Sequence, residues 1–216
     1  MGILLVPLVA MAMPVRASTG FLLLILVEAD LMAVLYWRRR AVWPQLFRVL
    51  PWTALGVVGG YFVMRLLDDR GFKSILGAMI VGIVALDLVR RWARVGIAPE
   101  NKAFSAVAGI LAGAFTMIAN AAGPIMTIYL LSMDLPKEEF VGTGAIFYCI
   151  VNLFKVPFSI SLGLVTWSTL RSDLMLLPLI ALGCLVGIFC MRKLPQKAFN
   201  ILAQALAALG GFKLFF

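Results

Sequence analysis

The stretch FTMIANAAGPIMTIYLLSMD, residues 115–134, decides the fold. It is apolar over most of its length, as a membrane-spanning helix is, but Asn120, two alanines, Gly123 and Pro124 interrupt its middle. Proline inside a helix removes one backbone hydrogen bond and clashes with the carbonyl group four residues earlier, which here belongs to Asn120. We therefore predict a helix that opens between Asn120 and Pro124, at membrane depth.

This break has two interpretations. Unpaired backbone groups at membrane depth are tolerated only where they are buried in protein or line a wet cavity. A half-helix that starts at Gly123 and Pro124 would direct free N–H groups and the positive end of its dipole at an anion, as the discontinuous helices of transporters do. Asn120, Gly123 and Pro124 are therefore candidate substrate-binding residues. The alternative is a plain proline kink, packed against a neighbouring helix through Gly109, Gly113 and Ala121.

The composition is that of a membrane protein. Of the 216 residues 63% are hydrophobic and 13% are charged, and the mean hydropathy of +1.04 is far above that of soluble domains. A spanning helix needs roughly 20 apolar residues, so the chain has room for about seven or eight spans and no sizeable soluble domain. The sequence predicts an all-α polytopic membrane protein with apolar runs at 2–13, 18–37, 47–66, 73–91, 104–133, 142–163, 173–190 and 198–216.

The charged residues and cysteines exclude several classes of function. The net charge of +9 comes from short basic clusters between apolar runs, which is typical of loops at a membrane face and not of a nucleic-acid-binding surface. There is no histidine and no CxxC spacing among the three cysteines, so we expect no metal site and no cofactor. No P-loop pattern is present, so ATP would have to come from a separate subunit. Without histidine, a GxSxG pattern or paired aspartates on broken helices, an enzyme is not expected. The partners we expect are the lipid bilayer and a small anionic substrate, and the chain is a candidate for homo-oligomerisation.

The chain contains an internal repeat. The sequences LGVVGGYFVMR at 55–65 and LGCLVGIFCMR at 182–192 place two glycines and one arginine at the same intervals. We predict two tandem four-helix repeats with helices broken near the membrane midplane, residues 1–92 and 103–216, joined by a polar loop over 93–102. The second repeat has a half-helix before its break that the first repeat lacks, so we expect the first repeat to be incomplete at its N-terminus.

With this repeat, the chain resembles the sulfite exporter TauE/SafE family, also called the 4-toluene sulfonate uptake permease family. The motifs are AGILAGAFTMIANAAGP, LSMDLP and VGTGAIFYCIVNL in the second half, and VPLVAMAMP and ASTGFLLLILVEADL in the first. The resemblance implies a secondary transporter of sulfite or an organosulfonate in the bacterial cytoplasmic membrane. Thr143, in the GT entry to its helix, is a further candidate substrate-binding residue. The alternative is a structural or accessory membrane subunit, or a transport-inactive member, which the incomplete first repeat favours.

The run 142–163 carries a polar face. Tyr148, Asn152, Lys155 and Ser159 fall at i, i+4, i+7 and i+11 of an otherwise apolar helix. A lysine at the centre of a span costs roughly 2.5 to 3.5 kcal/mol on insertion scales. We therefore predict that Lys155 and Asn152 face a substrate cavity. The alternatives are that Lys155 extends to the membrane surface or forms a structural ion pair.

Two acidic residues, Glu28 and Asp30, lie in the apolar run 18–37. When the repeats are aligned on their Thr-Gly pairs, Glu28 is equivalent to Asn152, and Lys155 lies one residue past the equivalent of Asp30. Two residues apart on a helix is about 200°, so both acids cannot point at one site. One could pair with Lys155 while the other meets a different helix. A buried carboxylate that binds a proton would suit proton-coupled transport, and a purely structural ion pair is the alternative.

Overall fold

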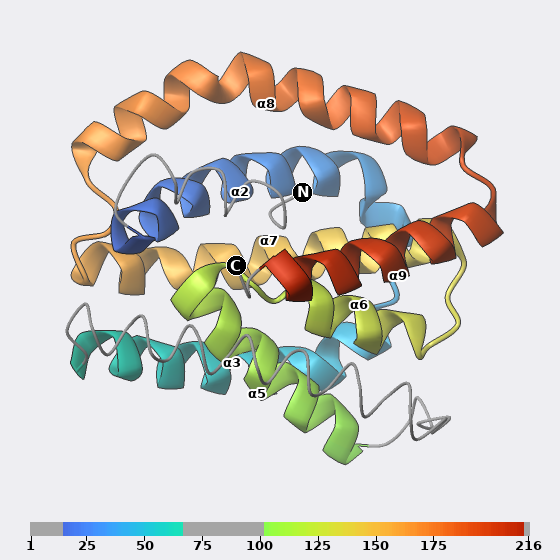
Figure 1. The fold of residues 1–216 in the computed structure, drawn as a ribbon, viewed down its shortest axis with the longest axis horizontal. Helices are drawn as coiled ribbons and strands as arrows, with labels where there is room; N and C mark the ends of the chain where they lie inside the picture. Colours follow the sequence, from blue (N-terminus) through green and yellow to red (C-terminus); the bar gives the residue numbers. More distant parts are fainter. Residues whose placement is uncertain (1–14, 67–101, 214–216) are drawn as a thin grey trace.

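The computed structural model describes residues 15–66 and 102–213, and all regular secondary structure in these ranges is helical (Figure 1). The elements are α2 (Val15–Trp37), η1 (Arg38–Arg40), α3 (Trp43–Leu66), α5 (Lys102–Ala119), α6 (Gly123–Leu131), α7 (Lys137–Ser161), α8 (Trp167–Lys193) and α9 (Gln196–Lys213). Within these ranges, five segments are long and apolar enough to cross a membrane: α2 with η1, α3, α5, α7 and α8. The prediction of an all-α polytopic membrane protein is confirmed. The predicted runs 2–13 and 73–91, and the loop 93–102 except for Lys102, lie outside the described residues.

Two helices begin several residues before the apolar runs that predicted them. α7 starts at Lys137, and its first turn holds Glu138 and Glu139. Their negative charges interact favourably with the positive end of the helix dipole. α8 starts at Trp167, after a capping box in which the Thr166 and Thr169 side chains bond to each other's backbone N–H groups. Charged and hydroxyl side chains thus stabilise helical turns that lie before the apolar runs.

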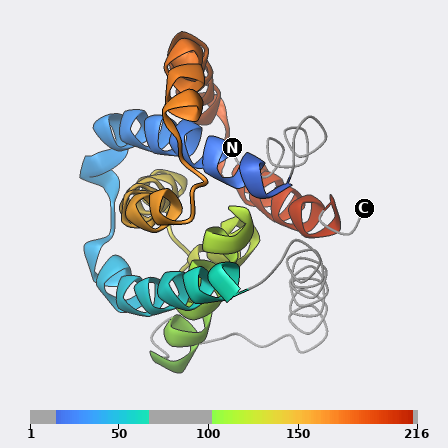
Figure 2. The same cartoon turned by 90° about the vertical axis from the view of Figure 1, so that its left-hand side faces the viewer.

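The centre of the bundle is α7, which contacts α2, η1, α3, α6 and α9. Figure 2 shows α7 enclosed by α2, α3 and α6. The hydrophobic core lies where α3, α5, α6 and α7 meet, and it includes the fully buried Tyr129 and Phe147. α8 lies at the outside of the bundle, along α2 (Figure 1). A polar residue on α7 therefore points into protein, whereas most of α8 is in a position to face lipid.

The helices α2 and α7, which the repeat makes equivalent, run antiparallel. A Cβ added to Gly20 would lie 2.0 Å from the Leu164 carbonyl oxygen, so the start of α2 touches the loop after α7. At the other end, Thr143 near the start of α7 bonds to Val42 in the loop after η1. Antiparallel equivalents are typical of inverted-topology repeats. The boundaries 1–92 and 103–216 stay a prediction, because most of the link between them lies outside the described residues.

Glycines bring the backbones of α3 and α5 into contact. A Cβ on Gly56 would lie 2.2 Å from the Ile110 carbonyl oxygen, and a Cβ on Gly113 would lie 2.1 Å from the Thr53 carbonyl oxygen. Small residues are what permits such an approach between membrane helices. On α8, by contrast, no described atom lies within 4 Å of a Cβ added to Gly183. The α3 contact fixes the position of α5 and, with it, of the chain break.

Candidate functional site

The predicted break is present and separates two helices. α5 ends at Ala119 and α6 begins at Gly123. Asn120 turns the chain with a φ of 52°, a left-handed conformation that asparagine tolerates better than most residues. Because Asn120 is no longer helical, Pro124 does not clash with its carbonyl group. Pro124 lies instead in the first turn of α6, where its missing N–H costs no hydrogen bond.

The backbone around the break is only partly hydrogen-bonded by the helices themselves. The Asn120 N–H donates to the Thr116 carbonyl at 3.0 Å, and the Ala121 N–H donates to the Phe115 carbonyl at 3.3 Å. These bonds complete the end of α5. The first turn of α6 carries the N–H groups of Gly123 and Ile125, which have no acceptor within their own helix. The break therefore presents donors and the positive end of a helix dipole inside the protein.

Lys155 of α7 reaches this break from the side. Its side chain is 1% exposed, so it does not extend to the membrane surface. The ammonium Nζ donates to Asn120 Oδ1 at 2.6 Å, to Thr116 Oγ1 at 3.1 Å and to Asn152 Oδ1 at 3.2 Å. All three acceptors are neutral, and no carboxylate oxygen of the described residues lies within 4.0 Å. The positive charge is thus buried and hydrogen-bonded, but it is not neutralised by direct contact.

The amide of Asn152 separates Lys155 from Asp30. Its Nδ2 donates to Asp30 Oδ2 at 2.7 Å, while its Oδ1 accepts from Lys155. Only this orientation of the amide satisfies both neighbours, because an ammonium only donates and a carboxylate only accepts. The direct ion pair between Lys155 and Asp30, one of the two sequence-based alternatives, is not formed. We call Lys155 and its three partners Thr116, Asn120 and Asn152 the Lys155 cluster. Asp30 is linked to this cluster through Asn152.

Glu28 lies on a different side of α2. Its Oε2 is buried and has no hydrogen-bond partner among the described residues. Its charge acts on Asp173 of α8, whereas Asp30 meets α7. This separation follows from the angle of about 200° between residues two apart on a helix. Of the two acids, only Asp30 therefore lies next to the Lys155 cluster.

Comparison with known proteins identifies the family to which the chain belongs. The family model described as Sulfite exporter TauE/SafE matches residues 1–214. The chain belongs to the TauE/SafE family. It is accordingly a multi-pass membrane transport protein. Comparisons with curated proteins and with solved structures gave no match.

In this TauE/SafE chain the predicted polar face of α7 does point into the protein. Asn152 and Ser159 are 2% and 3% exposed, and Tyr148 is half-buried. Thr143 is elsewhere, because it precedes Lys155 by 12 residues, which is about 18 Å along a helix. Its Oγ1 accepts a hydrogen bond of 2.9 Å from the Val42 N–H. The structure therefore does not bring Thr143 to the cluster.

Two members of the cluster were missed by the sequence analysis. Thr116 Oγ1 accepts a hydrogen bond from Lys155. Thr116 precedes Asn120 by four residues, about one helical turn, and that spacing could have identified it. The other is the backbone carbonyl of Thr19, which accepts a hydrogen bond of 3.0 Å from Asn120 Nδ2. No sequence pattern marks a backbone carbonyl, since every residue has one. Together these contacts tie the break to both α2 and α7.

Proposed function

We propose that this TauE/SafE chain is a secondary transporter that moves sulfite or a small organosulfonate across the bacterial cytoplasmic membrane, with Lys155 as its anion-binding group. The observation that carries the proposal is the Lys155 ammonium, buried beside the start of α6 and bonded to three neutral oxygens. Family membership supports the sulfur-containing substrate class. The residues supply the affinity for an anion.

An arriving oxyanion would exchange places with a neutral acceptor. Replacing the Asn120 or Thr116 oxygen on Lys155 by an anionic oxygen gives a charge-assisted hydrogen bond, which is roughly twice as strong as a neutral one. The Asn120 and Thr116 side chains would then be free to rotate and donate to the same anion. The N–H groups of Gly123 and Ile125 would add donors at the positive end of α6. Sulfite and sulfonates carry three oxygens on one sulfur, so one molecule can use several of these donors together.

Asp30 provides a means of coupling to protons. It is one amide away from Lys155, because Asn152 bonds to both. An anion on Lys155 would be repelled by a charged Asp30 carboxylate, and this repulsion is strong in a medium of low dielectric constant. A proton bound to Asp30 would remove this repulsion between the carboxylate and the anion. We infer that the anion and a proton bind together and move in the same direction.

Uptake into proteoliposomes tests this function. Radiolabelled sulfite would be supplied to vesicles containing the wild-type chain, Lys155→Met or Lys102→Met, with an inward proton gradient. Lys102 is an exposed lysine in the first turn of α5, so its variant controls for loss of positive charge. We expect saturable uptake by the wild type and by Lys102→Met, competition by a short alkylsulfonate, and at least tenfold slower uptake by Lys155→Met. Equal uptake by all three proteins and by empty vesicles would contradict the proposal.

A further inference from the structure

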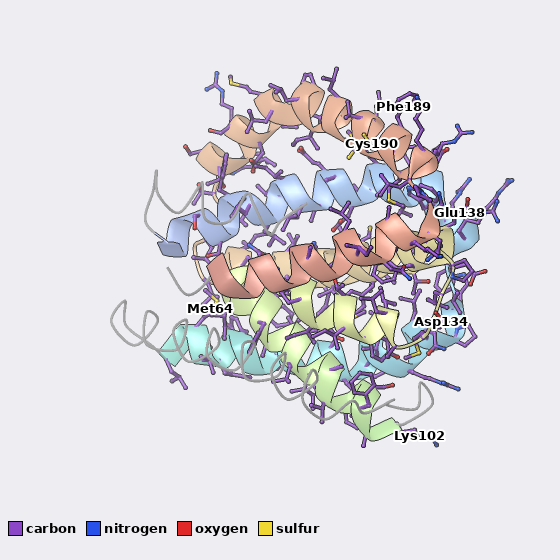
Figure 3. All side chains as sticks on the ribbon, turned by 45° about the vertical axis from the view of Figure 1, so that its right-hand side comes forward. Met64, Lys102, Asp134, Glu138, Phe189 and Cys190 are labelled. Atoms are coloured by element: carbon purple, nitrogen blue, oxygen red, sulfur yellow. The ribbon has the colours of Figure 1, made fainter. Side chains whose placement is uncertain are left out.

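Asp173 is the exception on an otherwise exposed helix. α8 lies at the edge of the bundle, where Figure 3 shows Phe189 and Cys190, and the apolar neighbours Leu174 and Met175 are 56% and 70% exposed. Asp173 is 0% exposed, and it is the one side chain of α8 that is buried among the described residues. α8 thus turns its apolar side chains outward and keeps a carboxyl group inside.

This buried carboxyl group has no hydrogen-bond partner among the residues that the structure describes. Neither Oδ1 nor Oδ2 of Asp173 has a donor within reach among the described residues. A buried polar group without a partner is costly, and a buried charge without one is far more so. The group therefore needs either a ligand or a proton, and a bound proton removes the charge and turns one oxygen into a donor.

The surroundings of Asp173 supply another acid. α8 packs on α2, and the charged group of α2 that acts on Asp173 is Glu28. Glu28 itself has one buried oxygen without a partner, and no described lysine or arginine pairs with either acid. Two neighbouring carboxylates of the same charge disfavour simultaneous ionisation. Among the described residues, the α2–α8 contact therefore brings two acids together without a paired base.

A proton fits this site better than a metal ion does. Among the described residues no group of three acidic, cysteine or histidine side chains could hold a metal. A proton needs only one carboxyl oxygen. The site and the Lys155 cluster flank the same helix, since α2 carries Glu28 on the side of α8 and Asp30 on the side of α7.

We propose that Asp173 is a proton-binding site at the α2–α8 contact and that its proton is exchanged with solvent during the transport cycle. The second part rests on the proposed transport of an anion, whereas the first does not. In this scheme Glu28 of α2 lies beside the proton site at Asp173, and Asp30 of α2 lies beside the anion site at Lys155. Asp173 is then a second proton site beside Asp30, on the opposite side of α2, while Lys155 binds the substrate.

Infrared difference spectroscopy tests the proton site without any substrate. The purified chain would be titrated with acid, and the C=O stretching band of protonated carboxyl groups would be recorded for the wild type, Asp173→Asn and Asp134→Asn. Asp134 is an exposed loop residue with a φ of 49°, a conformation that asparagine adopts readily, so its variant is a matched control. We expect Asp173→Asn to lose one band that the wild type and Asp134→Asn retain.

An unchanged spectrum in Asp173→Asn would overturn the proposal, as would a band that responds to sodium at constant pH. If Asp173→Asn does not fold, the wild type labelled with ¹³C-carboxyl aspartate replaces it, and a protonated band that does not shift with the label would refute an aspartate origin.

Transport assays then test the coupling role. Asp173→Asn should accumulate sulfite at least tenfold less than the wild type under a proton gradient, but it should exchange internal for external sulfite at a rate within threefold of the wild type. Equal loss of both activities, or loss of neither, would overturn the coupling role. If the wild type moves no sulfur anion at all, the proposed function fails, and the infrared result still decides whether Asp173 binds a proton.

Discussion

Asn120 has two separable tasks at the break, and a pair of substitutions distinguishes them. Its side chain accepts from Lys155 at 2.6 Å and donates to the Thr19 carbonyl at 3.0 Å. A hydrogen bond to a charged group contributes about 1.5–3 kcal/mol and a neutral one about 0.5–1.5 kcal/mol. Loss of both should therefore lower the free energy of unfolding by about 2–4.5 kcal/mol. The left-handed backbone of Asn120, with a φ of 52°, makes a second contribution to the change in the free energy of unfolding.

That contribution depends on the residue that replaces Asn120. A branched side chain in the left-handed conformation costs roughly 1–2 kcal/mol, whereas glycine adopts it freely. Asn120→Gly should thus lose only the side-chain hydrogen bonds, and Asn120→Leu should be less stable than Asn120→Gly by about 1–2 kcal/mol. The assay is equilibrium unfolding in mixed micelles, with the helical circular dichroism signal as readout.

Asp134 is the matched control, because it is exposed and has a φ of 49°. Asp134→Gly should leave stability unchanged or raise it, and Asp134→Leu should show the backbone cost alone. Asn120→Gly as stable as the wild type would refute the side-chain contacts with Lys155 and Thr19. Asn120→Leu as stable as Asn120→Gly would refute the left-handed turn between α5 and α6.

Three further predictions concern contacts around the cluster. Thr143→Val removes the acceptor of the Val42 N–H, so it should lower the free energy of unfolding by about 1 kcal/mol. It should leave sulfite affinity within twofold of the wild type, and a tenfold loss of affinity in calorimetry would show that Thr143 belongs to the binding site. Gly113→Val should prevent folding, since its Cβ would lie 2.1 Å from the α3 backbone. Gly59→Val, whose Cβ has no described atom within 4 Å, should give a normal, monodisperse gel-filtration profile; equal profiles for the two variants would contradict the helix contact. Asp30→Asn should abolish the rise in sulfite affinity that we expect in the wild type as pH falls, and a retained rise would locate the coupling proton elsewhere.

Patterns within one helix were readable from the sequence. The interruption at Asn120 to Pro124 and the inward polar face of α7 both follow from residues a few positions apart, where helix geometry alone relates one side chain to the next. The opposite sides of α2 taken by Glu28 and Asp30 were predicted in the same way.

Contacts between helices were not readable to the same degree. Asn120 and the Thr19 carbonyl are 101 residues apart, and Asn152 and Asp30 are 122 residues apart. Such pairings depend on how helices are placed against one another, which periodicity does not determine. The same limit explains Thr143, whose partner is a backbone N–H of another segment. It also explains Asp173, which in sequence is merely the polar edge of an apolar run.

The binding of sulfite to the purified chain tests the central claim, that Lys155 at the helix break binds an anion. Isothermal titration calorimetry would compare the wild type, Lys155→Met and the exposed-lysine control Lys102→Met. Because a hydrogen bond to a charged group contributes about 1.5–3 kcal/mol, and 1.4 kcal/mol is tenfold in affinity, Lys155→Met should bind sulfite about 10- to 100-fold more weakly. Lys102→Met should bind as the wild type does. A Kd for Lys155→Met within twofold of the wild-type value would contradict the account.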